Sequence, residues 1–360
     1  LATVAVACSG DDGGGDDPGS AEEPTSTTTS AANVDGVLTG ATARLSGQIT
    51  IAGRLDVEAS EPVRLDVTAT AGDRVVEVPR TAEARSSHQI PLVGLRAETT
   101  YEVAVEAVDD TGEVIGTATT ELTTGALPDW FPQVTLNSSA PDRMAPGVTL
   151  FDLQRWGVTP PPGEPPGLLV ALDEEGEVVW YYAHRLGAGD SRMTANGNII
   201  FLQAPFGFRE IDLTGRLVRQ WTWGDENTRD RPAQVVIQSP QWDLVSIHHE
   251  VAPQPSGNIV IFARRQLDLT PEEQDRICPG DPVDFGIRED VVMEVTRDGE
   301  VVREWSLSDV VDPAEVPGRE LCAVDFEDYR DWAHGNGIVL DEANNRVLVS
   351  ARHIDLLFAF

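Results

Sequence analysis

The chain has 360 residues, of which 41% are hydrophobic, and a formal net charge of −34. All 26 basic residues are arginine, which excludes a Walker-type phosphate loop, a lysine Schiff base to pyridoxal phosphate and a lysine contact to a nucleotide cofactor. The 60 acidic residues argue against nucleic acid as a partner, because affinity for phosphate backbones rests on clustered positive charge.

The amino-terminal residues resemble the end of a lipoprotein signal. Residues 1–8, LATVAVAC, form a short apolar run that ends at Cys8, the expected lipid-accepting residue. Residues 9–40 are acidic and rich in Gly, Ser and Thr, which predicts a disordered tether. We therefore expect an extracytoplasmic protein, in the periplasm or at the cell surface, that contacts the membrane only through a lipid on Cys8. A disordered leader with a chance cysteine is the alternative.

The other two cysteines, Cys278 and Cys322, are an even pair. In an oxidising compartment such a pair predicts a disulfide bond. Two separate thiols in unrelated loops are the alternative.

Short alternating segments in residues 41–127 predict a β-sandwich. Tyr101, Val103, Val105 and Ala107 fall on one face of an expected strand, and acidic residues fall on the other. The order of residues before this strand resembles the corner of a fibronectin type III or immunoglobulin-like sandwich. Such a domain implies a spacer or a packing role.

An internal repeat predicts the fold of residues 128–360. Three segments contain a strand, a turn with glycine and a second strand that carries a tryptophan: 167–182 with Trp180, 207–223 with Trp221 and 291–307 with Trp305. Between them, 194–203, 254–265 and 342–353 each place a turn before a strand. Four strands per unit with a recurring tryptophan are typical of β-propeller blades. We predict an all-β chain with a partial propeller, in which the tryptophans pack between blades; a second sandwich is the alternative.

The expected strands are too few for a closed ring. About thirteen strands between residues 147 and 360 make three to four blades at four strands per blade. The sequence DLLFAF ends in what resembles mid-strand, so we expect a carboxyl-terminal truncation or blades supplied from elsewhere. An open edge would be exposed to solvent and to other chains, and a homo-oligomer is compatible with it.

Polar residues near positions 334 and 352 are candidates for a site. His334 and Asn336, in DWAHGN, are expected on one face, with glycines that allow close backbone approach. Arg352 lies eighteen residues after His334 in VLVSARH, and strand alternation would turn His353 to the opposite face.

An upstream histidine pair adds to this set. His248 and His249, in HHEV, would point to opposite faces of an extended strand, so we expect one of them to join the site. An arginine fork with imidazole and amide donors suits a tetrahedral oxyanion such as a sulfuryl or phosphoryl group. Histidine can also protonate a leaving phenolic oxygen.

The motifs DWAHGN, VLVSARH and HHEV, within the blade repeats, resemble the bacterial arylsulfate sulfotransferase family. The resemblance implies a six-bladed propeller with an amino-terminal β-sandwich, exported from the cytoplasm. It implies sulfuryl transfer from a phenolic sulfate ester to a phenolic acceptor, without a nucleotide donor, a metal or a cofactor. It implies that His334, Arg352 and one of His248 and His249 are catalytic residues and that Asn336 binds substrate.

One departure from the family concerns the nucleophile. The family uses a histidine that becomes sulfated in a ping-pong cycle and that lies in a later blade than SARH. No residue of this chain matches it. The resemblance therefore implies a route through a sulfated histidine that this chain does not contain.

Structural roles for the same residues are the alternative. His334 and Asn336 would then satisfy backbone groups at a strand entrance, and Arg352 would pair with Asp331 or Asp341.

Two other functional interpretations were weighed. A zinc site built from His248, His249, His334 and Glu250 does not match the helical HExxH spacing, so no metal site is predicted. A non-catalytic extracytoplasmic β-propeller that binds a ligand or a partner protein is the alternative function.

Overall fold

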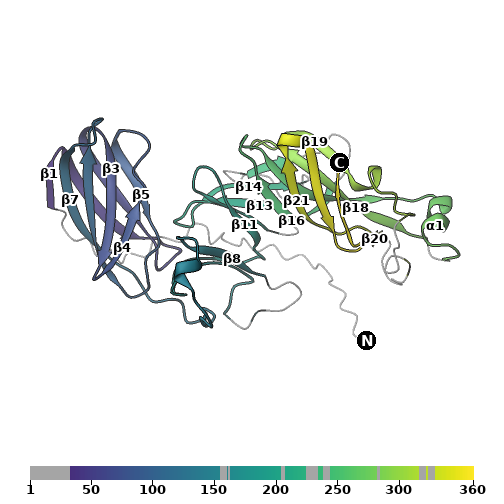
Figure 1. The fold of residues 1–360 in the computed structure, drawn as a ribbon, viewed down its shortest axis with the longest axis horizontal. Helices are drawn as coiled ribbons and strands as arrows, with labels where there is room; N and C mark the ends of the chain where they lie inside the picture. Colours follow the sequence, from purple (N-terminus) through teal and green to yellow (C-terminus); the bar gives the residue numbers. More distant parts are fainter. Residues whose placement is uncertain are drawn as a thin grey trace, which may run out of the picture.

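The computed structural model describes residues 33–154, 160, 163–203, 207–223, 234–237, 244–281, 284–315, 322 and 329–360. In these ranges α1 (Pro271–Ile277) is the one α-helix, and almost all other regular structure is strand, so the all-β prediction is confirmed. A β-sandwich lies at one end of the molecule and a group of smaller sheets at the other (Figure 1). None of the helices in this part of the chain has the length and apolar character needed to cross a membrane. Cys8 and the expected signal lie outside the described residues.

The sandwich contains seven strands, and the long β3 connects its two layers. One half of β3 pairs with β2 and β5, and the other half pairs with β4 and β6, while β6 continues through β7 to β1. The expected start at residue 41 falls within β2, and β1 lies before it. The strands are β1 (Asn33–Gly36), β2 (Leu38–Leu45), β3 (Gly53–Ala71), β4 (Arg74–Val78), β5 (Arg85–Leu92), β6 (Thr100–Val108) and β7 (Val114–Thr123).

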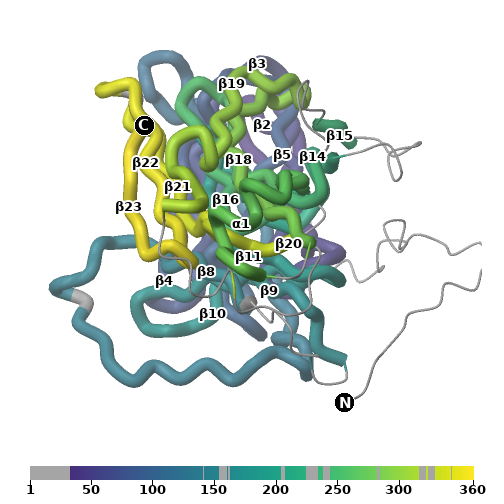
Figure 2. The backbone as a smooth tube through the Cα atoms, turned by 90° about the vertical axis from the view of Figure 1, so that its right-hand side faces the viewer, coloured from purple at the N-terminus to yellow at the C-terminus, as the bar shows by residue number. Residues whose placement is uncertain are grey.

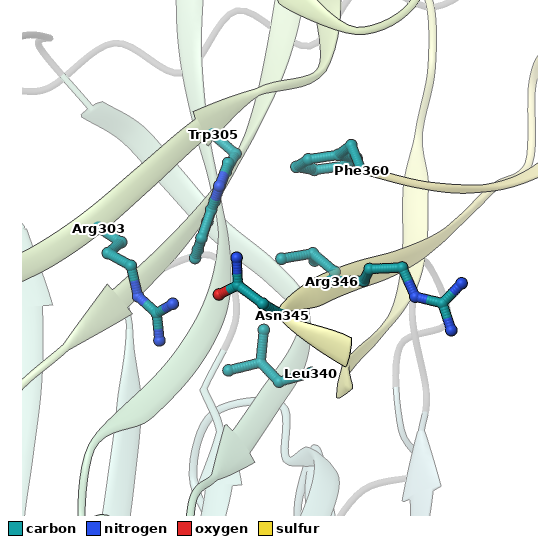
Figure 3. Close-up of a pocket in the computed structure, with 7 residues that line it drawn as sticks. Arg303, Trp305, Leu340, Asn345, Arg346 and Phe360 are labelled. Carbon is teal, nitrogen blue, oxygen red and sulfur yellow. The ribbon is translucent and has the colours of Figure 1, made fainter. Parts of the chain in front are cut away.

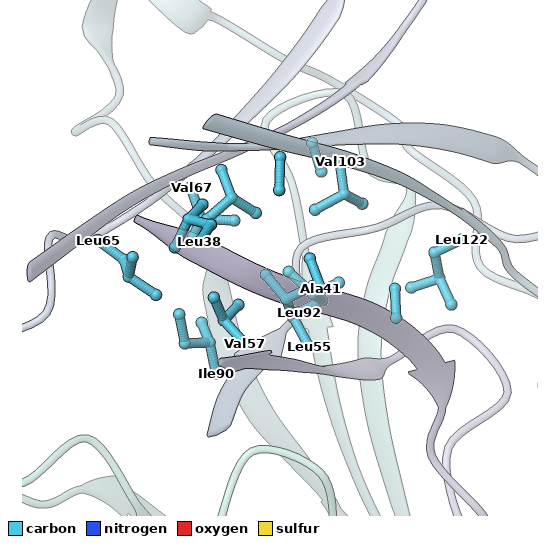
Figure 4. Close-up of a cluster of buried hydrophobic side chains, with 14 of the residues drawn as sticks. Leu38, Ala41, Leu55, Val57, Leu65, Val67, Ile90, Leu92, Val103 and Leu122 are labelled. Atoms are coloured by element: carbon cyan, nitrogen blue, oxygen red, sulfur yellow. The ribbon is translucent and has the colours of Figure 1, made fainter. Parts of the chain in front are cut away.

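The core of the sandwich follows the alternation seen in the sequence. Tyr101, Val103 and Val105 of β6 are almost completely buried among aliphatic side chains from β2, β3 and β5. Figure 4 shows Val103 in this cluster together with side chains of those strands, such as Leu38 and Leu92. The backbone N–H of Arg96 donates to the Tyr101 hydroxyl at 2.9 Å. The expected corner is therefore present, because a corner tyrosine bonds to the backbone a few residues upstream.

Beyond the sandwich, four sheets follow one another in the manner of propeller blades. The first strands of the sheets, β8, β11, β16 and β21, lie beside one another in succession and form the inner side. Figure 2 shows β21–β23 in yellow beside the green sheet that contains β16 and β18. The propeller prediction is confirmed, and the segments expected as hairpins contain β9–β10, β13–β14 and β18–β19.

The blades differ in strand number. Blade 1 contains β8 (Thr149–Gln154), β9 (Gly167–Leu172) and β10 (Val178–His184). Blade 2 contains β11 (Gly189–Met193), β12 (Ile199–Leu202), β13 (Phe208–Ile211), β14 (Leu217–Trp223) and β15 (Gln234–Ile237). Blade 3 contains β16 (Leu244–Pro253), β17 (Ile259–Leu267), β18 (Gly286–Val295), β19 (Val301–Ser306) and β20 (Tyr329–Asp331). Blade 4 contains β21 (Gly335–Asp341), β22 (Arg346–Ala351) and β23 (Leu356–Ala359).

The sandwich and blade 1 share a hydrophobic core. Ile49 and Ile51, in the loop between β2 and β3, are fully buried in the same cluster as the blade 1 side chains. The backbone N–H of Thr50 donates to the Tyr181 hydroxyl at 3.2 Å. This loop therefore belongs to the packing of both domains.

Tryptophans connect successive blades. The indole N–H of Trp180 in blade 1 donates to the carbonyl of Leu213 in blade 2 at 2.8 Å. The indole of Trp221 in blade 2 makes the same contact with the carbonyl of Arg297 in blade 3 at 3.0 Å. Both side chains are buried, which confirms their predicted packing role. Trp305 is only partly buried, and its ring packs edge-on against Phe360.

Carboxylates connect the inner strands in a second repeated contact. Asp190 of β11 accepts the backbone N–H of Val251 in β16 at 2.5 Å. Glu250 of β16 accepts the backbone N–H of Ile338 in β21 at 3.2 Å. Blades 2 and 3 thus each satisfy a backbone donor of the next blade near the inner side of the propeller.

Replacing Trp221 by phenylalanine tests the indole contact. Trp221→Phe removes the indole donor and leaves the Arg297 carbonyl with the bond from Arg219 alone, so we expect a loss of about 0.5–1.5 kcal/mol in the free energy of unfolding. Trp305→Phe is the matched control and should change it much less. Urea unfolding followed by circular dichroism measures both; equal losses would contradict a specific role for the Trp221 contact.

Candidate active site

Four of the six histidines in the chain gather between blades 3 and 4. His248 and His249 belong to β16, His334 immediately precedes β21, and His353 lies in the turn after β22. Ring centroids lie 5.2 Å apart for His248 and His249, 4.9 Å for His249 and His334, and 4.6 Å for His334 and His353. Segments separated by about a hundred positions thus meet in one cluster, here called the histidine cluster.

Both His248 and His249 join this cluster, so the expectation that only one would do so is wrong. The pairing of β16 with β17 shifts register between His248 and Val251, which marks a β-bulge. His249 within the bulge has a φ of 56°, in the left-handed region that few non-glycine residues adopt. A bulge reorients side chains relative to strict alternation. Both imidazoles therefore face His334.

His353 joins the cluster, whereas Arg352 has an exposed side chain. The strand ends at Ala351, and residues 352–355 form a turn, so strand alternation does not apply to this pair. The backbone N–H of Arg352 donates to the carbonyl of His334 at 3.0 Å. The Arg352 backbone is thus adjacent to the cluster, and among the described residues its guanidinium has no ion-pair partner. The alternative, a pairing of Arg352 with Asp331 or Asp341, is not found among the described residues.

Asn336 lies in a second bulge, in β21. The pairing with β22 shifts register between Gly335 and Gly337, and the Asn336 side chain is exposed. A Cβ on Gly335 would lie 2.6 Å from the ring of Phe262, so this position requires glycine. That contact confirms the expected close backbone approach at Gly335.

The carboxylate of Asp290, in β18, is completely buried and joins four strands. It accepts hydrogen bonds from His248 Nε2 at 2.9 Å, Arg264 Nε at 2.9 Å and the Gly335 backbone N–H at 2.6 Å. Burial by itself would raise the pKa of Asp290, but His248 and Arg264 hold that pKa far below its usual range. Asp290 is therefore ionised and fixes the orientation of His248.

A second carboxylate, Asp331, orients the other half of the cluster. It accepts from His334 Nδ1 at 2.6 Å and from Arg264 at 3.2 Å, and its backbone carbonyl accepts from His353 Nδ1 at 2.7 Å. Burial opposes ionisation, but the bonds from His334 and Arg264 lower the pKa of Asp331. Arg264 thus bridges two aspartates, each of which holds a histidine.

His249 and His334 contact each other through one ring nitrogen of each side chain. His249 Nε2 lies 2.8 Å from His334 Nε2. Burial, followed by the charges of His248 and His334, lowers the pKa of His249 to about 4. His249 is therefore neutral near pH 7, and a chain of contacts runs from Asp331 through His334 to His249.

Four residues of this arrangement were not predicted as site residues: Arg264, Asp290, Asp331 and His353. Arg264 and Asp290 lie in long apolar strands, in FARR and REDVV. A charged residue inside such a strand is a usable signal, because buried charges are normally paired.

The remaining predicted residues lie elsewhere. Cys278 and Cys322 form a disulfide bond. Glu250, considered above for a zinc site, bonds to Arg192 and to the backbone N–H of Ile338, and it does not group with the histidines as a metal ligand.

A separate pocket of about 290 Å³ lies between blades 3 and 4 (Figure 3). Trp305 and Phe360 flank it, and Arg303 and Arg346 line it. Both arginines form ion pairs, with Glu294 and Asp341 respectively. No histidine lines this pocket, so it is distinct from the histidine cluster.

Comparison with known proteins places this geometry in context. The model of the arylsulfotransferase (ASST) family matches residues 135–360, and that of the arylsulfotransferase Ig-like domain matches residues 51–125. No curated protein matches the chain. A crystal structure of a protein of unknown function from Bacteroides caccae is 15% identical and covers 70% of this chain and 96% of that chain. Its TM-score of 0.22 is too low to bear on the fold.

Replacing Asp290 by asparagine tests its role as the shared acceptor. Asp290→Asn removes the negative charge that balances Arg264 in a fully buried position, and we expect a loss of about 3 kcal/mol or more in the free energy of unfolding. Asp341→Asn, which breaks the surface pair with Arg346, is the matched control and should change the unfolding midpoint little. Similar effects of the two substitutions in urea unfolding would refute the assigned role.

Glu250 predicts a pH dependence of stability. Burial, followed by the neighbouring Asp190 carboxylate, raises the pKa of Glu250 from 4.5 to about 7. The folded chain therefore keeps a proton that the unfolded chain releases, so this contribution to stability falls as the pH rises from about 4.5 to 7. Relative to Glu250→Gln, the wild-type chain should lose stability over this window in urea unfolding at several pH values. A difference that does not change with pH would contradict the prediction.

Proposed function

The chain belongs to the arylsulfotransferase family, and on this premise we propose that it transfers a sulfuryl group from a phenolic sulfate ester to a phenolic acceptor. The family membership supports sulfuryl transfer in general. The histidine cluster beside the backbone of Arg352 is the observation that carries the assignment to this part of the molecule.

The sulfuryl group of the donor would lie over His334 and His249. A sulfate monoester presents three oxygens, which require several donors in fixed positions. Imidazole N–H groups and the exposed amide of Asn336 supply such donors. A preorganised set of such donors stabilises charge that develops on the oxygens in the transition state.

Arg352 would supply the positive charge. The guanidinium of Arg264 is engaged by the carboxylates of both Asp290 and Asp331. An anionic ester therefore needs a further cation to bind here. Arg352 is adjacent through its backbone bond to His334 and is exposed, so a side-chain rotation can bring the guanidinium to the sulfuryl oxygens.

The reaction proposed is a ping-pong transfer that uses no nucleotide donor. An S–N bond to a histidine that these 360 residues do not include forms as the S–O bond to the donor phenol breaks, and the departing phenolate takes a proton. The acceptor phenol then loses its proton, and its oxygen forms an S–O bond as the S–N bond breaks and the histidine is released. A cluster histidine is suited to move these protons, because imidazole titrates near neutral pH. The absence of lysine fits a route without a nucleotide sulfate donor.

We also propose that the protein acts outside the cytoplasm, anchored by a lipid on Cys8. The disulfide between Cys278 and Cys322 supports an oxidising compartment, where such bonds persist. The apolar run that ends at Cys8 supports lipidation.

An assay of sulfuryl transfer from 4-nitrophenyl sulfate to phenol tests the function, on the 360-residue chain and on the full-length product of its gene. Where turnover is seen, Arg352→Ala and His334→Gln should each lower kcat/KM about a hundredfold or more, because each removes a donor to the sulfuryl oxygens. His88→Gln, in the sandwich, is the control and should leave the rate unchanged. No turnover by either folded form would refute the proposal and favour the non-catalytic binding module.

A further inference from the structure

The contact between His249 and His334 holds a single hydrogen atom. His249 Nε2 lies 2.8 Å from His334 Nε2, so one of these nitrogens donates an N–H and the other accepts it. His334 Nδ1 faces the Asp331 carboxylate at 2.6 Å, and an ionised carboxylate only accepts, so this nitrogen always carries a hydrogen. When both rings are neutral, His334 Nε2 therefore has a lone pair, and His249 Nε2 donates to it.

The same contact can hold one more proton without losing a hydrogen bond. When a proton binds to Nδ1 of His249, the hydrogen between the two Nε2 atoms can move to His334. His334 is then an imidazolium that donates one N–H to Asp331 and one to His249, and His249 is neutral again. Because His249 is exposed, solvent can supply this proton. The two rings, here called the histidine pair, can thus gain and release a proton as one unit.

The groups around the pair place the added charge on His334. Burial, followed by the charges of His248 and His334, lowers the pKa of His249 to about 4, so His249 is not the ring that remains charged. An ionised carboxylate on Nδ1 favours the charged form of His334. The ionisable side chains around His334 come from several elements: His248 and His249 of β16, Arg264 of β17, Asp290 of β18, Asp331 of β20 and His353 after β22.

A sulfate ester changes the affinity of the pair for a proton, because it carries a negative charge. The proposed function places the sulfuryl group over His334 and His249. An opposite charge within about 4–6 Å favours the imidazolium, so the pKa of the pair is higher with the ester bound than without it. Between these two pKa values, the free pair is mostly neutral and the ester-bound pair is mostly protonated.

We propose that binding of a sulfate ester is coupled to the uptake of one proton by the histidine pair, with Asp331 as the positioning residue of His334. This inference rests on the proposed function and deepens it. As the S–O bond to the donor phenol breaks, the pair gives its proton to the phenolate oxygen, and it regains one from the acceptor phenol. Affinity for the ester therefore falls as the pH rises from the pKa of the free pair to that of the bound pair.

Binding of 4-nitrobenzenesulfonate tests the coupling without turnover, because its sulfur is bonded to carbon and the group cannot be transferred. Calorimetric titrations of the full-length gene product between about pH 6 and 9, where imidazole titrates, are made in buffers of different ionisation enthalpy and give the protons taken up per bound sulfonate. We expect this number to rise to about one, and the plot of log affinity against pH to approach a slope of about −1 at the same pH.

His334→Gln distinguishes the histidine pair from other groups that titrate. Glutamine keeps a polar side chain but takes up no proton, so we expect the sulfonate to bind without proton uptake. Glu250→Gln is the matched control, because Glu250 follows His249 in β16 and burial raises its pKa to about 7; here the uptake should persist. Uptake that persists in His334→Gln or disappears in Glu250→Gln would overturn the proposal. The same holds if the wild-type protein binds the sulfonate without uptake at any pH, or does not bind it.

Asp331→Asn tests positioning and also decides the matter if His334→Gln binds the sulfonate too weakly to titrate. An asparagine still accepts from His334 through its amide oxygen, but the negative charge is lost. We expect proton uptake to remain and to move to lower pH by about one unit or more. Circular dichroism establishes that each variant is folded. Weaker binding at every pH with no shift of the uptake would show a purely structural role and overturn the assignment of Asp331.

The sulfonate experiment and the transferase assay fail independently. Proton-coupled binding by a protein that turns over no ester would refute the transfer reaction and leave the coupling in place. Turnover of 4-nitrophenyl sulfate together with sulfonate binding that takes up no proton would support the transfer reaction and refute the coupling.

Discussion

The buried carboxylate of Asp290 is the constraint on which the histidine cluster depends. It accepts from side chains of β16 and β17 and from the backbone at the start of β21, while itself lying on β18. A buried charge is stable only when it is paired and hydrogen-bonded. The hydrogen bonds that stabilise Asp290 therefore also determine the orientation of His248 and the position at which β21 begins. As a result, a change in the packing of blade 4 on blade 3 would also change the geometry of the cluster.

The cluster also depends on irregularities in otherwise regular blades. His249 and His334 both have positive φ angles, and both lie at or beside a bulge on the inner strand of their blade. Strained backbone of this kind persists where surrounding structure holds it in place. The bonds from the Gly335 N–H to Asp290 and from the Ile338 N–H to Glu250 provide that support, because both connect blade 3 to blade 4 beside the bulges.

Much of the fold was predictable from the sequence, but the site was predictable only in part. The repeat of strand, turn and tryptophan indicated the blades because each blade must bury both faces, and the alternation around Tyr101 indicated the sandwich. The approach of His334 to an upstream histidine followed from the same repeat. The sequence did not predict that His353, rather than Arg352, faces the cluster, because a turn interrupts the strand alternation at these two residues. It also did not predict that His248 and His249 both face the cluster, because a bulge interrupts the alternation of β16. Asp290 and Arg264 were not predicted as site residues, because they lie on different strands and tertiary packing determines which strands are neighbours.

The shared core of the sandwich and blade 1 bears on how the chain folds. Ile49 and Ile51 come from the sandwich, yet their burial is completed by side chains of the propeller. Apolar side chains left in water lose the stabilisation that burial supplies. The two domains, distinct in sequence and in strand topology, are thus coupled energetically: the sandwich reaches its full stability only when blade 1 is formed. A boundary drawn between them along the chain separates two topological units but cuts through a shared core.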